Sequence, residues 1–305
     1  MLKEKNASMF LRNAEFTRLK IVEQLGERRS TLMVDASLFS NTFHSGDQLM
    51  QQEQSVLLDV AVFHSFKRIP ISTGMFSKAD KAVFPDGDAV AVKFDFKGSF
   101  GFQSLAVMSH EHRILKFIGK HTNIVKTIGL VHLGDMFVHV MNYESGLNLA
   151  NFFKKKLSIT SLNEFQGLVN GVASGLNFLF SKGVLHNHLV ADNIIFKDNS
   201  PVIIGFTFAC RIESAKVKIE RVLQKFENQQ HFAPELFKGS KVSCASDVYA
   251  YGYLLQLILK FSMYELDDTM ETRLNCIVGH CLKRNPGERL PHIFLSDRLK
   301  AILSL

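Results

Sequence analysis

The sequence contains no apolar run of about 18 residues, the length that a membrane-spanning helix needs. Its first residues, Met1–Asn6, also lack the apolar core of a secretory signal peptide. The four cysteines form no CxxC pair and no metal-like group with neighbouring histidines. Such cysteines are typical of thiols in a reducing compartment. They are Cys210, Cys244, Cys276 and Cys281. We therefore expect a soluble, cytoplasmic protein with no membrane span.

The chain carries a moderate excess of positive charge. The chain carries 36 Lys and Arg against 29 Asp and Glu, which gives a net charge of +7 and a pI of about 9.2. This balance is typical of an ordinary soluble protein, and binding to nucleic acid or an anionic membrane is the minority interpretation. The only compact basic run, Lys154–Lys156, is too short to indicate a binding patch by itself. We expect no nucleic-acid partner.

The hydrophobic pattern between residues 66 and 142 is that of a small β-rich region. Short alternating or apolar runs, such as Ala89–Val92 and Met136–Val140, predict strands. One segment with helical spacing, Phe102–Ile118, interrupts them. No internal repeat or low-complexity linker is present.

Residues 143–305 have mainly helical spacing. The predicted helices are Asn163–Ser181, Ala245–Leu259 and Thr269–Leu282. Residues 1–65 contain helix-like patches but no recognisable chemistry, and we treat them as an N-terminal extension of unknown role. At 305 residues and 46% hydrophobic, the chain can bury one or two substantial cores. The sequence predicts an α+β fold with a small β-rich lobe followed by a larger helical lobe.

The most informative motifs lie at residues 186–193 and 202–207. They read His-Asn-His-Leu-Val-Ala-Asp-Asn and Val-Ile-Ile-Gly-Phe-Thr. Together they resemble the catalytic core of the protein kinase family. That family places a base aspartate five residues before a metal-binding asparagine, and a magnesium-binding aspartate just before a phenylalanine. Asn193 matches the asparagine, but His188 and Gly205 stand where the family has its two aspartates.

Motifs toward the N-terminus extend the resemblance. Lys93 ends an apolar strand, and Glu111 falls where kinases carry the glutamate that pairs with this lysine. A buried lysine needs such a partner, since an unpaired buried charge is costly. Of the glycine-rich loop that covers the ATP phosphates, only Gly74 is kept. The resemblance also implies a hinge that contacts nucleotide through Met141 and Tyr143.

Motifs toward the C-terminus resemble structural parts of the family. Phe-Ala-Pro-Glu, ending at Glu235, resembles the end of the activation segment, and the resemblance implies a buried pair between Glu235 and Arg289. Asp247 matches the aspartate that supports the catalytic loop from beneath. His186 and Phe206 fall at packing positions. The structural motifs are thus better kept than the chemical ones.

The substitutions affect separate parts of phosphoryl transfer. Asn193 is a neutral ligand, whereas magnesium in such sites is usually held by one or two carboxylates, so the loss at Gly205 weakens metal binding. Replacing the base by His188 removes a group typically worth about 10²–10⁴ in rate. Val190 replaces the lysine that serine/threonine kinases use on the γ-phosphate, and Asn187 replaces the arginine that reads activation-loop phosphorylation. Our interpretation is a kinase-like site with degraded chemistry.

The resemblance covers roughly residues 66–305 and implies a bilobal fold with a lobe boundary at 142/143. The first hypothesis is a pseudokinase that acts as a scaffold or allosteric partner of other proteins. ATP is a candidate ligand, and magnesium is a doubtful one. The second hypothesis is an active but divergent kinase acting on Ser, Thr or Tyr. The third and weaker one is binding of nucleic acid or acidic lipid through a basic surface.

Overall fold

The computed structural model divides into two compact units. The sheet unit comprises Met1–Phe117 and Lys126–Tyr143, and the helical unit comprises Ile118–Val125 and Glu144–Leu305. The residues that the structure describes are 67–73, 77–83, 89–95, 104–133, 136–214 and 230–303. The expected N-terminal extension, residues 1–65, lies outside them, as does Gly74.

The sheet unit is built on a five-stranded antiparallel sheet in the order β1-β2-β3-β5-β4. The strands are β1 (Lys67–Thr73), β2 (Ser77–Val83), β3 (Ala89–Asp95), β4 (Thr127–Leu133) and β5 (Met136–Asn142). The strands predicted at Ala89–Val92 and Met136–Val140 are confirmed as parts of β3 and β5. The register pairs Lys93 directly with His139. Directly paired residues project from the same face of a sheet, so these two side chains share one face.

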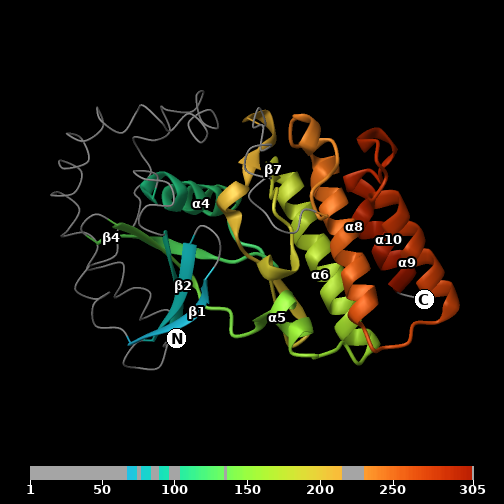
Figure 1. Cartoon of the computed structure of the whole chain (residues 1–305), viewed down its shortest axis with the longest axis horizontal. Coiled ribbons are helices and arrows are strands. Elements are labelled where there is room, and N and C mark those ends of the chain that lie inside the picture. The colour runs from blue at the N-terminus through green and yellow to red at the C-terminus, as the bar shows by residue number, and fades with distance from the viewer. Residues whose placement is uncertain are drawn as a thin grey trace. The chain divides into compact units, whose positions relative to one another are not determined.

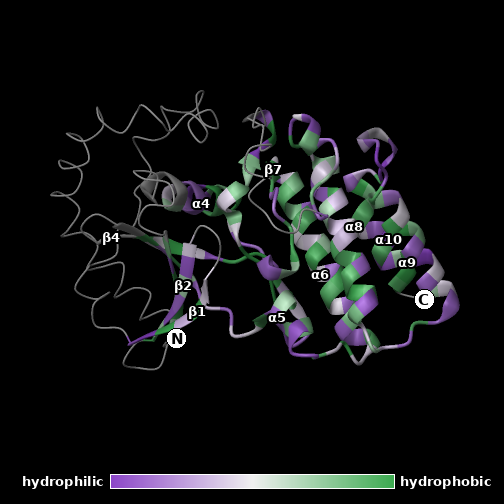
Figure 2. Ribbon diagram, in the orientation of Figure 1, coloured by the Kyte–Doolittle hydropathy of each residue, from purple (hydrophilic) through white to green (hydrophobic). Residues whose placement is uncertain are grey.

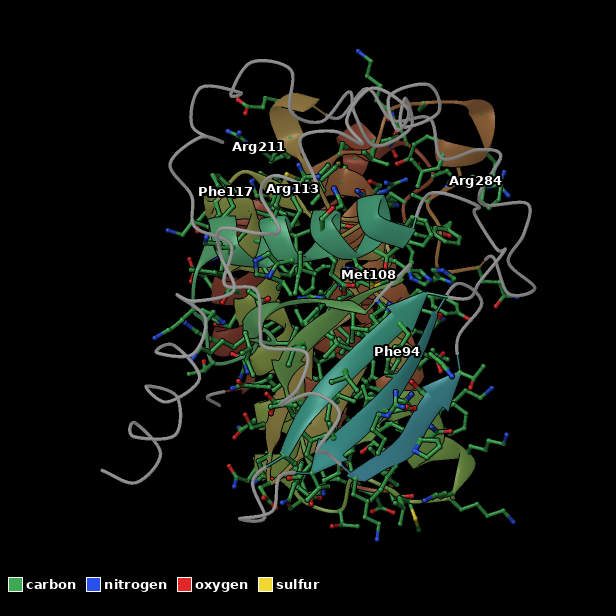
Figure 3. All side chains as sticks on the ribbon, turned by 90° about the vertical axis from the view of Figure 1, so that its left-hand side faces the viewer. Phe94, Met108, Arg113, Phe117, Arg211 and Arg284 are labelled. Atoms are coloured by element: carbon green, nitrogen blue, oxygen red, sulfur yellow. The ribbon has the colours of Figure 1, made fainter. Side chains whose placement is uncertain are left out.

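Helix α4 (Ser104–Ile118) crosses the strands, as Figure 3 shows. This confirms the helix predicted at Phe102–Ile118. Its buried stripe follows the spacing of one helix face, at Met108, Glu111, His112 and Leu115. Met108 and Phe94 of β3, both labelled in Figure 3, are buried apolar members of this core. The same stripe therefore places a glutamate and a histidine in the interior, where each needs a polar partner.

Within the described residues, the helical unit contains four long helices whose contacts place them side by side (Figure 1). The helices in this described part are α5 (Leu149–Lys154), α6 (Leu162–Ser181), α8 (Cys244–Phe261), α9 (Asp268–Cys281) and α10 (His292–Leu303). The three helices predicted in this region are confirmed as α6, α8 and α9. Apolar and polar residues alternate around α6 and α8 (Figure 2), and the apolar ones form the core. None of the helices within the described ranges is both long and apolar enough to span a membrane.

Side chains mark where these helices begin. Ser161 and Asp267 accept hydrogen bonds from backbone N–H groups in the first turns of α6 and α9. Helix α8 begins with a capping box, in which Ser243 and Ser246 each accept from the other's backbone N–H. These local signals explain why the helix boundaries follow the sequence closely.

Short elements connect the helices and carry the expected catalytic motifs. Strands β6 (Leu147–Asn148), β8 (Ile194–Lys197) and β9 (Ser200–Ile203) form one small sheet, and β7 (Val184–Leu185) pairs with β10 (Cys210–Arg211). The turn between β8 and β9 has positive φ at Asp198 and Asn199, as tight hairpins require. The 3₁₀ turns are η3 (Ala191–Asn193), η4 (Phe206–Phe208), η5 (Ile212–Ser214), η6 (Leu236–Lys238) and η7 (Pro286–Glu288).

Candidate functional site

In the sheet unit, Lys93 and Glu111 form a buried ion pair. The Lys93 Nζ donates to Glu111 Oε2 at 2.7 Å, and the two side chains are 12% and 0% exposed. Burial by itself would raise the pKa of Glu111, but Lys93 and then His139 outweigh it and hold the pKa well below its usual range. Glu111 is therefore ionised, and the structure brings together the two residues that the sequence paired.

The expected hinge residues lie at the end of β5. Met141 is buried, and the neighbouring Asn142 N–H donates to the Lys126 carbonyl at 2.9 Å. The Tyr143 ring lies beneath the ammonium of Lys81, 4.5 Å from ring centroid to Nζ. These contacts order the backbone that the family resemblance assigns to nucleotide binding.

In the helical unit, Asp247 of α8 supports the loop that begins at His186. Its carboxylate accepts from the backbone N–H of His186 at 2.6 Å and from that of Asn187 at 2.8 Å. Burial raises the pKa of Asp247 to about 7, and the two hydrogen bonds oppose that rise. The His186 ring lies edge-on to Phe206, with centroids 4.8 Å apart, and its Nε2 donates to the Ile204 carbonyl at 3.0 Å. These contacts fix the backbone of the loop at its first two residues.

His188, at the expected base position, is engaged by Asn193. The Asn193 amide nitrogen lies 2.9 Å from the His188 carbonyl oxygen and 3.1 Å from His188 Nδ1. Because that amide nitrogen can only donate, His188 Nδ1 is the acceptor and the neutral ring carries its proton on Nε2. The basic lone pair of His188 therefore points at Asn193. The ring stacks on Phe232 and lies edge-on to Phe208, which holds this orientation.

Gly205, at the expected metal position, lies directly against Asn193. Gly205 is left-handed, with φ 80° and ψ 51°. A Cβ at this position would come within 2.6 Å of Asn193 Cγ and closer still to the amide oxygen. In this arrangement the amide of Asn193 occupies the space that a larger side chain at position 205 would need.

Magnesium prefers octahedral oxygen ligands that include one or two carboxylates. The amide oxygen of Asn193 has no carboxylate at position 205 to complement it. Throughout the described parts of the chain, no three His, Cys, Asp or Glu side chains gather as they would to hold a metal ion.

Glu235 and Arg289 form the second buried ion pair. The two terminal nitrogens of Arg289 donate to the two carboxylate oxygens of Glu235 at 2.7 and 2.6 Å, and its side chain is 1% exposed. Arg289 also donates to the carbonyls of Ala245 at 2.9 Å and Lys283 at 2.8 Å. One side chain thus ties together three segments of the helical unit.

Sequence reasoning missed the residues around Glu111. His139 Nδ1 lies 3.7 Å from Glu111 Oε2, and His139 Nε2 lies 2.9 Å from Thr127 Oγ1. Thr127 Oγ1 in turn lies 2.7 Å from His112 Nδ1. Two signals were available in the sequence: a histidine between two valines in a predicted strand, and two polar residues on the apolar stripe of a helix.

Comparisons with known proteins agree with these motifs. A family model described as protein tyrosine and serine/threonine kinase matches residues 69–292. RGS domain-containing serine/threonine-protein kinase A of Dictyostelium discoideum is 23% identical over 76% of the chain, and LRR receptor kinase SERK2 of Oryza sativa subsp. japonica is 26% identical over 75%. Megakaryocyte-associated tyrosine-protein kinase of Mus musculus is 23% identical over 59%. The chain spans only 21%, 41% and 39% of these three relatives, respectively.

Proposed function

Because this chain belongs to the protein kinase superfamily, we propose that it is a pseudokinase, which acts as a scaffold or allosteric partner of other proteins. The observation that carries the proposal is the contact among His188, Asn193 and Gly205. Asn193 donates to the His188 carbonyl at 2.9 Å and presses against Gly205. Asn193, which the family uses to bind metal, and His188, which stands at the position of the base, instead form hydrogen bonds with each other.

The chemistry of phosphoryl transfer supports this proposal. The reaction depends on positioning and on neutralising charge with metal ions, so both acids matter. His188 directs its basic nitrogen at Asn193, and the position of Gly205 offers no carboxylate. Loss of general-base assistance alone typically lowers a rate by about 10²–10⁴. By contrast, the Glu235–Arg289 pair is intact. The ion pair that stabilises the fold is thus kept while the groups for phosphoryl transfer are lost, as expected of a protein selected for binding.

Nucleotide binding without magnesium is the finer part of the proposal. Lys93, held in place by Glu111, would supply the cation that faces the phosphates, and Met141 and Tyr143 would border the base. A thermal-shift titration of the whole chain with ATP tests this, once with magnesium and once with EDTA. We expect stabilisation by ATP that is the same in both conditions and absent in Lys93→Ala. A shift that requires magnesium would contradict metal-independent binding, and no shift in either condition would reject nucleotide binding.

An active, divergent kinase is the second candidate, and the intact Lys93–Glu111 ion pair favours it. Transfer of labelled phosphate from ATP, with magnesium or manganese, distinguishes the two. Under the pseudokinase proposal, no transfer is expected above that of Lys93→Ala. Transfer that Lys93→Ala abolishes and His188→Gln preserves would establish a kinase with another base. Transfer that both variants abolish would assign the base to His188.

A basic surface in the helical unit is the weaker, third candidate. Lys154–Lys156 are exposed, and among the described residues none of these lysines has a carboxylate partner. Phe153 stacks on Phe261 with centroids 4.9 Å apart, which brings exposed Lys260 to the same end of the unit. Retention on anionic vesicles or on RNA should then fall steeply with salt and disappear when the three lysines are replaced by serine. Retention unaffected by salt would count against this surface.

A further inference from the structure

A closed ring of polar contacts ties α4 to two strands of the sheet unit. His112 on α4 contacts Thr127 on β4 at 2.7 Å, and Thr127 contacts His139 on β5 at 2.9 Å. His139 returns to α4 with its Nδ1 3.7 Å from Glu111 Oε2. Glu111 and His112 are consecutive residues, so the contacts close a ring. Glu111 and His139 are fully buried, His112 is 5% exposed and Thr127 is half-buried, so water has little access to the two histidines and the glutamate.

The single hydroxyl proton of Thr127 limits how protons can be arranged. Thr127 Oγ1 faces a ring nitrogen on each side, His112 Nδ1 and His139 Nε2. If its proton goes to one of these nitrogens, the other nitrogen must donate to it. When His139 Nε2 is the acceptor, the neutral His139 ring carries its proton on Nδ1. When His139 Nε2 is the donor, Nδ1 is either bare or protonated in a cationic ring.

The carboxylate of Glu111 selects among these arrangements. A bare Nδ1 on His139 would point a lone pair at an ionised oxygen in a buried site, which is repulsive. A protonated Nδ1 is attractive there, whether the ring is neutral or cationic. Burial lowers the pKa of His112 to about 4, and the nearby cations Lys116 and Arg113 add to the effect, so His112 stays neutral and can complete the closed set of contacts. In every acceptable arrangement, His139 carries a proton on Nδ1.

We propose that His139, Thr127 and His112 are positioning residues that hold α4 against the sheet, so that the Lys93–Glu111 ion pair forms in the protein without any ligand. The register supports this, since His139 lies directly opposite Lys93 and both approach the same oxygen of Glu111. Because α4 crosses the strands (Figure 3), these contacts fix the position of its middle turns over the sheet. The closed ring of contacts concerns only the Lys93–Glu111 ion pair. This inference therefore does not depend on the pseudokinase proposal.

The first test is the reactivity of Lys93 in the whole chain without nucleotide. Trace acetylation with acetic anhydride, followed by mass spectrometry, reports how often the Lys93 amine leaves its buried pair. Thr127→Val keeps the shape of the side chain but removes the hydroxyl, and Thr127→Ser keeps the hydroxyl and is the matched control. We expect Lys93 to react roughly five-fold faster or more in Thr127→Val, the factor expected from two lost neutral hydrogen bonds. Thr127→Ser should remain close to the unaltered protein. Equal rates of Lys93 acetylation in Thr127→Val and Thr127→Ser would overturn the proposal.

The second test does not depend on the folding of Thr127→Val. Nitrogen-15 NMR of labelled histidines distinguishes an imidazole protonated on Nδ1 from one with a bare Nδ1. We expect a proton on Nδ1 of His139, whose signal is assigned by its loss in His139→Gln. A bare Nδ1 would overturn the proposal even if Thr127→Val failed to fold. Both tests use ligand-free protein, so a failure of ATP binding leaves them unchanged, and their failure leaves the pseudokinase proposal standing.

Discussion

Replacing Gly205 by alanine should destabilise the helical unit more than a glycine-to-alanine change at a position with a similar φ. The perturbation adds one methyl group against the amide of Asn193. Two effects combine. A non-glycine residue in the left-handed conformation costs about 1–2 kcal/mol. The methyl group also forces Asn193 away from His188, with which it makes contacts of 2.9 and 3.1 Å. Losing two such hydrogen bonds costs about 1–3 kcal/mol in total.

Gly119 offers a matched control for the backbone effect. Its φ is 79°, close to the 80° of Gly205, and a Cβ there would meet nothing within 4 Å. Gly119→Ala should therefore cost only about 1–2 kcal/mol, whereas Gly205→Ala should cost about 2–5 kcal/mol. Urea unfolding followed by far-ultraviolet circular dichroism measures both, because the long helices dominate that signal and the chain contains no tryptophan to follow.

A double-mutant cycle separates the contact with Asn193 from other causes. In an Asn193→Ala background the amide is absent, so adding Gly205→Ala should cost only the backbone part, about 1–2 kcal/mol. The reasoning would be refuted if Gly205→Ala cost no more than Gly119→Ala. It would also be refuted if the full cost of Gly205→Ala persisted without the Asn193 amide. Either result would mean that the Asn193 amide does not fill the space that a side chain at position 205 would need.

Three further predictions concern the stability of the helical unit. Arg289→Ala should destabilise this unit by about 3–5 kcal/mol in urea unfolding, because Glu235 loses its buried partner. Arg289→Lys should recover only part of this stability, since lysine cannot make the two paired contacts with the carboxylate. Full recovery in Arg289→Lys would contradict the paired geometry. Burial lowers the pKa of His231 to about 4, so the unfolded chain binds more protons than the folded one from about pH 6.5 down to 4, and stability should fall in that window by about 2–3 kcal/mol. Asp247, whose pKa is raised by burial, changes the stability with pH in the opposite sense. The measured quantity is therefore the difference in unfolding free energy between the unaltered protein and His231→Phe at each pH. Identical pH profiles of these two proteins would count against the prediction. Ser243→Ala removes the capping box of α8 and should cost about 1 kcal/mol, whereas an unchanged urea midpoint would show that the cap contributes nothing.

Local signals in the sequence predicted the secondary structure well. Strands β3 and β5 follow apolar runs, and α6, α8 and α9 follow helical spacing. Capping side chains such as Ser243 explain why the boundaries agree to within one or two residues. The predicted segments within residues 1–65, and the loop at Gly74, lie outside the described residues and stay predictions.

The candidate site was predictable only in part. The positions of His188, Asn193 and Gly205 in the motifs identified which acids the chain lacks, because each family role is tied to an order and a spacing. The direction of the His188 lone pair could not be read in the same way. It depends on which atom of Asn193 faces the ring, and that follows from the fold of η3 and the loop before it.

By itself, the sequence determined the kinase family, the order of the elements and the absence of two catalytic acids, since these depend on residue type, periodicity and spacing along the chain. Only the tertiary structure decided what fills the places of those acids, and that His112, Thr127 and His139 surround Glu111. These residues come from one helix and two strands. Their contacts depend on strand register and on how α4 crosses the sheet, and neither is encoded in any local run of residues.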